Sequence, residues 1–211
     1  LYVAGEDAGG AHGSNRLGGN GVANSTVYGG VAGDIMGRVA LKMGALREPD
    51  EGILQDEIAR ACRPFAKTGG DLNSLRQDLR QTMWDDVGVM RDAAGLKTGL
   101  QKLEQIKRDL YDIGVEDGVR AFNLTWHDWL NLDNLIEISQ VIGAAALARE
   151  NSRGAHFRED FPTEGDLESS YFTLVKQIGD QLEVTREDVA FSIVRPGETI
   201  LPEDAPETLV S

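Results

Sequence analysis

The N-terminal loop between Gly5 and Gly21 holds the residues best suited to chemistry. Glycine recurs along this loop. Because each glycine costs ordering entropy, such a density is typical of backbone that approaches a ligand closely. Arg16 is the cation inside the loop. Its planar guanidinium can hold a carboxylate or a phosphate through two parallel hydrogen bonds, so the loop predicts a site for an anionic ligand.

The elements on either side of the loop would position Arg16. Residues 1–4 are apolar and predict the end of a buried strand. The chain is expected to become helical from Asn20 or Asn24, where Asn and Ser are capping candidates. Free N–H groups at a helix start carry partial positive charge, so this order of strand, loop and helix favours an anion. From these residues alone, an ordinary glycine-rich turn with a surface arginine remains an alternative.

Two sequence blocks resemble a known family. The first is Gly5-Glu6 followed by HGSNRLGGNGV at residues 12–22, and the second is SRGAHFREDFP at residues 152–162. Both resemble the flavoprotein subunit of the succinate dehydrogenase and fumarate reductase family, in which blocks of this kind have the same order and separation. The resemblance covers nearly the whole chain. It implies the C-terminal part of a longer polypeptide, in keeping with a sequence that starts without methionine.

The resemblance implies roles for five residues of the first block. Arg16 would bind a carboxylate of a dicarboxylic acid, and Gly19 would touch the same substrate through its backbone. Glu6 would hydrogen-bond the ribityl region of FAD. Gly21 and Val22 would lie at the helix start beside the pyrimidine edge of the flavin. A helix N-terminus at that place would stabilise the negative charge that a reduced flavin carries.

The implied function is the interconversion of succinate and fumarate, or of a related dicarboxylate, by hydride transfer with FAD. The family's proton-handling arginine and its ADP-binding unit belong upstream, so no catalytic residue is expected here and the segment alone should be inactive. The implied partners are upstream FAD-binding and capping domains and an iron–sulfur or other electron-transfer subunit. Two alternatives stay open: a flavoenzyme like L-aspartate oxidase, and a helical docking module for an electron-transfer subunit.

Composition excludes other classes of function. The 211 residues carry a formal net charge of −14, which disfavours nucleic acid as a partner. No apolar run is long enough to cross a bilayer, and a cytoplasmic setting, peripheral at the inner face of a membrane, is expected. His12, His127, His156 and Cys62 stand far apart, so no metal site is expected. His12 is interpreted as a loop-shaping residue.

The expected fold is mainly α. A helical bundle would follow the last strand–loop–helix segment of an FAD-binding α/β domain and precede a small C-terminal β extension. The expected domain boundaries are 1–36, 37–162 and 163–211. The second block is interpreted as a structural clamp that ties the bundle to the flavin domain, in preference to a solvated, salt-bridged loop.

Periodic Leu, Ile and Val residues predict five helices whose stripes form the core. The expected helices are 24–42, one opened by Pro49 at its first turn, one capped by Asp71, about 93–113 and about 123–150. Strand-forming residues predict a hairpin of 171–178 and 182–189 around a Gly179-Asp180 turn, with 191–194 as a candidate third strand.

Overall fold

The fold is mainly α-helical in a computed structural model that describes residues 2–45, 47–116, 118–179 and 181–199. The α-helices are α1 Asn20–Met43, α2 Glu51–Cys62, α3 Leu72–Asp85, α4 Ala93–Asp112 and α5 Leu124–Ala148. Short 3-10 turns are η1 Gly5–Asp7 and η2 Arg63–Ala66. The strands are β1 Met90–Arg91, β2 Phe157–Arg158, β3 Tyr171–Ile178 and β4 Gln181–Asp188. The predicted mainly α fold with a small β extension is confirmed.

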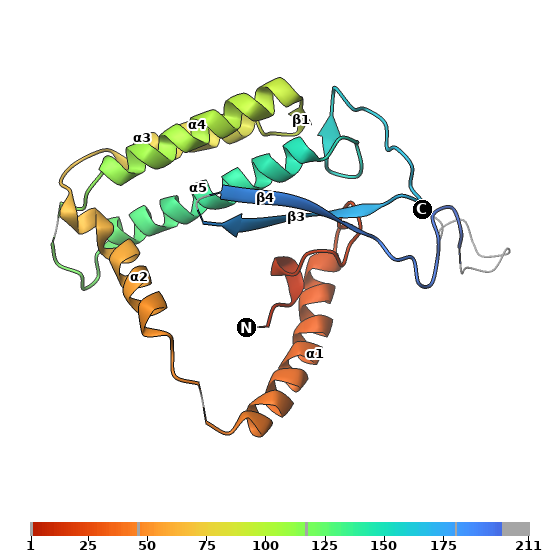
Figure 1. The fold of residues 1–211 in the computed structure, drawn as a ribbon, viewed down its shortest axis with the longest axis horizontal. Helices are drawn as coiled ribbons and strands as arrows, with labels where there is room; N and C mark the ends of the chain where they lie inside the picture. Colours follow the sequence, from red (N-terminus) through yellow and green to blue (C-terminus); the bar gives the residue numbers. More distant parts are fainter. Residues whose placement is uncertain (1, 46, 117, 180, 200–211) are drawn as a thin grey trace.

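Helices α3, α4 and α5 form the bundle, and the β3–β4 hairpin runs alongside α5 (Figure 1). The predicted leucine and isoleucine stripes of these three helices meet in one core. Its buried members are Leu75, Leu79, Leu103, Ile106, Leu110, Trp129, Leu132 and Ile136. The indole N–H of Trp129 donates to the carbonyls of Leu110 and Ile113, so even the polar atom of this core is satisfied.

Helix starts follow local capping chemistry in part. Asp71 accepts hydrogen bonds from the backbone N–H groups of the first turn of α3, which confirms its predicted role. The prediction for Pro49 is wrong, because Asp50 is the cap of α2 and Pro49 precedes it. The capping prediction for α1 is also wrong. Gly19 occupies that position with φ 83°, and the side chain of Asn24 is buried one turn inside the helix.

The β3–β4 hairpin pairs antiparallel in the predicted register, with Val175 opposite Val184. Asp180 of its predicted turn lies outside the described residues. The predicted strand at 191–194 is absent from the described chain, as is a strand at residues 2–4. Residues 2–4 have no neighbouring strand there to complete a hydrogen-bonded ladder.

Helices α1 and α2 stand away from the bundle (Figure 1). Their predicted stripes are not core within the described chain, because most of the apolar side chains in them are exposed. These exposed side chains include Val27, Val31, Ile35, Ile53, Leu54 and Ile58. Exposed apolar faces of this size mark surfaces that other protein covers. Within the described residues, no helix combines the length and hydropathy needed to span a membrane.

Candidate anion site at the start of helix α1

The loop before α1 is held by a contact between its own residues and the helix. The side-chain amide of Asn24 donates to Nε2 of His12 at 3.0 Å. This hydrogen bond agrees with the interpretation of His12 as loop-shaping. Gly5 of η1 lies against Ser25 of α1, where a Cβ would approach the serine hydroxyl to 2.7 Å. The loop is therefore fixed at two places to the first turns of α1.

The first turn of α1 presents unused hydrogen-bond donors. Gly19 precedes the helix with no side-chain cap. Within the described chain, the backbone N–H groups of Gly21 and Val22 have no acceptor, whereas that of Asn20 donates to Leu17. Free N–H groups aligned with the helix dipole attract negative charge. The turn is thus built to receive an anion.

Arg16 lies directly over this turn. A Cβ built on Gly21 would come within 2.8 Å of Nη1 and 3.4 Å of Cζ of Arg16, so the guanidinium lies against the bare Cα of that glycine. Arg16 is exposed and has no hydrogen-bond or ion-pair partner among the described residues. Its charge remains available to a ligand beside the helix start.

The structure brings some of the predicted site residues together. Arg16 and Gly21 are in contact, and Val22 is the next residue of the same turn, with 77% of its surface exposed. Gly19 forms the cap of this turn. Glu6 lies in η1 and has no hydrogen-bond or ion-pair partner within the described chain.

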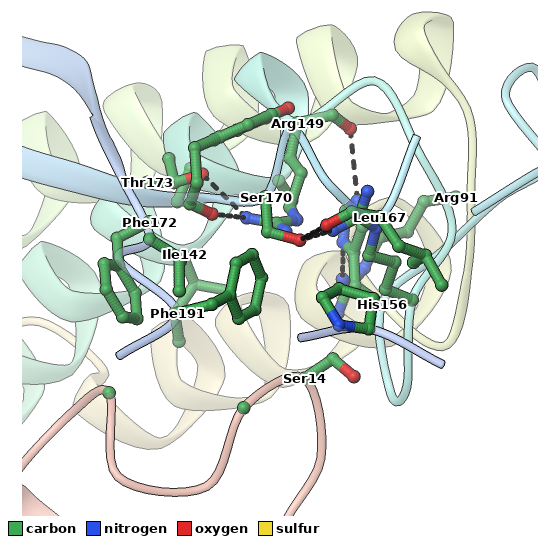
Figure 2. Close-up of a pocket in the computed structure, with 18 residues that line it drawn as sticks. Ser14, Arg91, Ile142, Arg149, His156, Leu167, Ser170, Phe172, Thr173 and Phe191 are labelled. Atoms are coloured by element: carbon green, nitrogen blue, oxygen red, sulfur yellow. Dashed lines mark hydrogen bonds between the residues drawn. The ribbon is translucent and has the colours of Figure 1, made fainter. Parts of the chain in front are cut away.

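The second block packs directly against the loop that carries Arg16. Gly154 has φ 56°, and a Cβ on it would overlap the carbonyl of Ser14. Figure 2 shows Ser14 facing His156 of the same block. The two sequence blocks are therefore neighbours in space, as the clamp interpretation requires.

Replacing Gly154 by Ala should loosen this contact. The added methyl group has no space beside Ser14, so we expect the free energy of unfolding to fall by about 1–3 kcal/mol. Urea denaturation of the intact protein measures the change. Gly179→Ala is the matched control, because Gly179 has a similar φ of 59° but no atom within 4 Å of its would-be Cβ. Equal losses in both variants would show that backbone strain, not the contact, is responsible.

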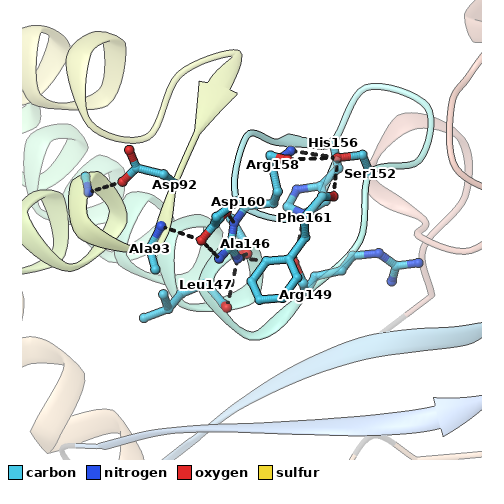
Figure 3. A network of polar contacts seen from close by, with 11 residues as sticks. Asp92, Ala93, Ala146, Leu147, Arg149, Ser152, His156, Arg158, Asp160 and Phe161 are labelled. Atoms are coloured by element: carbon cyan, nitrogen blue, oxygen red, sulfur yellow. Dashed lines mark hydrogen bonds and ion pairs between the residues drawn. The ribbon is translucent and has the colours of Figure 1, made fainter. Parts of the chain in front are cut away.

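The rest of the second block is anchored by a buried arginine (Figure 3). Arg158 has 1% of its surface exposed. Its Nη1 donates to the carbonyls of Ala146, Leu147 and Arg149 at the end of α5, at 2.9–3.2 Å. Its Nε and Nη2 donate to the carboxylate of Asp160 at 2.8 and 2.7 Å. A solvated loop is excluded by this burial.

Asp160 extends the network to the start of α4. Its Oδ2 accepts from the backbone N–H of Ala93 at 3.0 Å, and Arg91 pairs with Arg158 where β1 and β2 run parallel. These two-residue strands were missed by the sequence analysis, because pairs so short and so distant in sequence leave no periodic signal. The block thus ties together the beginning of α4, the end of α5 and the N-terminal loop.

The network makes stability depend on acid. The hydrogen bonds from Arg158 hold the pKa of Asp160 down to about 2. A carboxyl group whose pKa is lower in the folded state stabilises the fold above its unfolded pKa, and this stabilisation is lost as pH falls toward the folded value. We therefore expect the difference in urea midpoint between wild type and Asp160→Asn to be largest above about pH 4 and to shrink as pH falls toward 2. A constant difference over that range would contradict the assignment.

No metal centre is indicated. Among the described residues, no three His, Cys, Asp or Glu side chains gather closely enough to hold an ion. His156 lies partly buried between Arg91 and the end of α5, and burial is the main cause that lowers its pKa. The imidazole is therefore disposed to be neutral, and its contacts are structural.

Comparisons with known proteins agree with the two sequence blocks. The sequence model of the C-terminal region of the fumarate reductase flavoprotein matches residues 76–201. An uncharacterised FAD-dependent oxidoreductase of Methanocaldococcus jannaschii is 35% identical over 164 residues, which are 77% of this chain and 29% of that protein. One chain of the CoM/CoB fumarate reductase of Methanothermobacter marburgensis is 33% identical over 163 residues, with the same two shares.

A solved structure with a similar fold is Mycobacterium smegmatis Sdh1 in complex with UQ1. It superposes with a TM-score of 0.75 at 30% identity, covering 88% of this chain and 31% of that one. The chain spans about 29% of the length of the two curated relatives above. Because the family model covers more than half of the chain, this sequence belongs to the succinate dehydrogenase and fumarate reductase flavoprotein family, of which it is a C-terminal portion.

Proposed function

We propose that this chain is part of an FAD-dependent oxidoreductase that interconverts succinate and fumarate, or a closely related dicarboxylate pair. The observation that carries the proposal is the placement of Arg16 over the uncapped first turn of α1. A free guanidinium beside free N–H groups suits one carboxylate of the substrate. The relatives named fumarate reductase supply the reaction class.

The residues present fit a flavin at the same turn. The N–H groups of Gly21 and Val22 would face the pyrimidine edge of FAD, and Glu6 would hydrogen-bond its ribityl chain. When bound, FAD supplies the hydride acceptor and donor. The chain itself contributes positive potential at the start of α1, which favours the anionic reduced flavin, and it orients the dicarboxylate through Arg16 and the backbone of Gly19.

The partners of the proposed enzyme follow from surfaces that the described chain leaves open. The exposed apolar faces of α1 and α2 suit docking by FAD-binding and capping domains of the same polypeptide. An iron–sulfur or other electron-transfer subunit would carry electrons to or from the flavin. Such a subunit would hold the enzyme at the inner, cytoplasmic face of a membrane.

The proposal is tested with the intact protein. We expect a yellow protein with flavin absorbance, reduction of fumarate by a reduced dye, and oxidation of succinate by an oxidised one. L-Aspartate is the comparison substrate, because an aspartate oxidase would turn it over with oxygen. Absence of bound flavin, or turnover of aspartate alone, would overturn the proposal. The isolated 211-residue chain is expected to be inactive in all three assays.

A further inference from the structure

A second group of cations surrounds a cavity away from the start of α1. The cavity has a volume of about 640 Å³ and lies between the N-terminal loop, the end of α5, the second block and β3. Arg91, Arg149, Arg153 and His156 line it, whereas Arg16 does not. No role in the proposed reaction involves these residues.

The cavity has distinct polar and apolar sides. Figure 2 shows Ile142, Phe172 and Phe191 on one side, and Arg91 and His156 on the other. Phe172 also contacts the loop, since a Cβ on Gly10 would lie 3.6 Å from its ring. The floor between the two sides is backbone of the glycine loop. A ligand here would meet cations at one end and aromatic rings at the other.

Arg91 is held in place by neutral acceptors. Its Nε donates to the carbonyls of Val87 and Gly88 at 3.0 and 2.6 Å. Its Nη1 lies 2.8 Å from Nδ1 of His156. Because arginine can only donate, Nδ1 is the acceptor, and the imidazole proton is on Nε2, which donates to the carbonyl of Arg149 at 3.1 Å. His156 is therefore neutral in this arrangement and offers Arg91 no countercharge.

Arg149 is held in the same way. Its Nε donates to the side-chain carbonyl of Asn151 at 3.2 Å, and its Nη1 donates to Tyr171 O and Thr173 Oγ1 at 3.1 and 3.2 Å. Within the described chain, neither Arg149 nor Arg91 forms an ion pair, and Nη2 of each donates to no acceptor. No buried side-chain nitrogen is left without a partner there, so both Nη2 groups are open to solvent.

The electrostatic surroundings of these two guanidinium groups are unfavourable without a ligand. Burial and then the charge of Arg158 lower the pKa of Arg91. Burial also lowers the pKa of Arg149, and the charges of Arg153 and Arg186 act in the same direction. Arg153 differs, because its charge helps to lower the pKa of the Asp166 carboxyl. Two half-buried cations without a carboxylate, in a chain with a net charge of −14, favour the binding of an anion.

We propose that this cavity binds a small organic anion, with a carboxylate or phosphate head held by Nη2 of Arg91 and Arg149 and a flat apolar body against Phe172 and Phe191. The site is separate from the one at Arg16, and it does not depend on the proposed redox reaction. Charge-assisted hydrogen bonds supply the head-group recognition, and burial of the ring supplies the rest.

The test measures binding of small probes to the intact protein by titration calorimetry. Benzoate and phenyl phosphate carry the two head groups on the same ring, and benzyl alcohol is the neutral counterpart of benzoate. We expect one saturable site for at least one of the anions, and binding of benzyl alcohol at least about tenfold weaker. Whichever anion binds more tightly identifies the head group. Absence of saturable binding by both anions would overturn the proposal.

Variants locate the site. Arg91→Gln and Arg149→Gln should each weaken binding of the anion about tenfold or more, because each removes one charge-assisted hydrogen bond. Phe172→Ala, at a half-exposed position, should weaken it about threefold or more without threatening the fold. Arg108→Gln, at an exposed arginine paired with Glu104 on α4, is the matched control and should bind as wild type.

Arg16→Gln separates the two sites. Binding that survives in this variant but is weakened by Phe172→Ala supports the cavity, and the Phe172 result stands even where an arginine variant fails to fold. Binding that is lost in Arg16→Gln and unchanged in Phe172→Ala places the anion at the start of α1 and overturns the proposal.

Discussion

Replacing Arg16 by Gln in the intact protein is expected to lower kcat/KM for the dicarboxylate by about 10²- to 10³-fold. The guanidinium lies over the first turn of α1 with no partner in the described chain, so its hydrogen bonds are available to the substrate. Two charge-assisted hydrogen bonds contribute about 3–4 kcal/mol together, and each 1.4 kcal/mol corresponds to tenfold. Gln keeps a donor but has neither the charge nor the fork geometry. Steady-state kinetics with fumarate and with succinate measure the loss.

The matched control is Arg38→Gln, which removes another exposed arginine of α1 far along the helix from the loop. It should leave kcat/KM unchanged within about twofold, because an exposed charge at that distance is screened. Flavin absorbance should be the same in both variants, since Arg16 is assigned to the substrate and not to FAD. Unchanged kinetics in Arg16→Gln would remove the basis of the proposed function.

Local chemistry explains which parts of the fold the sequence could predict. Asp71 caps α3, and the stripe from Leu96 to Leu110 lies on the buried face of α4, because cap preference and helical period act over a few neighbouring residues. The β3–β4 hairpin is local in the same sense. The N-cap of α1 was missed because Asn24 meets His12, a contact that no capping rule contains.

The candidate site was predictable only in part. Arg16 could be singled out, since a cation among glycines before a helix has few structural uses. Its position over Gly21 could not, because that position depends on the three-dimensional path of the loop. The exposure of the apolar stripe on α1 was also unpredicted, since periodicity shows that a face will be covered and not which part of a protein covers it.

The second block shows the limit most clearly. Its charges fit both a solvated loop and a clamp, and only the structure distinguishes them, by burying Arg158 against three carbonyls at the end of α5. Those carbonyls are the acceptors that the end of a helix leaves unpaired. Their partner therefore comes from a residue that follows the helix by about ten positions. No local pattern records such a partnership.

Arg158→Met is accordingly expected to cause the largest loss of stability of any single change discussed above, about 3–5 kcal/mol of unfolding free energy. Methionine fills much of the volume of the arginine stem, so packing changes little. The carbonyls of Ala146 and Leu147 lose their donor in a buried place, and Asp160 loses its cation. Urea denaturation followed by circular dichroism measures the change, and thermal melting gives an independent value.

Arg108→Gln serves again as the control, since its salt bridge with Glu104 is more than half exposed on both sides and should contribute less than about 1 kcal/mol. Arg158→Lys separates charge from geometry. Lysine keeps the cation but cannot reach Asp160 and the α5 carbonyls at the same time with its single nitrogen, so it should recover only part of the loss. Full recovery by lysine would mean that charge alone matters. A loss below about 1 kcal/mol in Arg158→Met would mean that the second block does not hold the end of α5, and that packing of β3 on α5 does so instead.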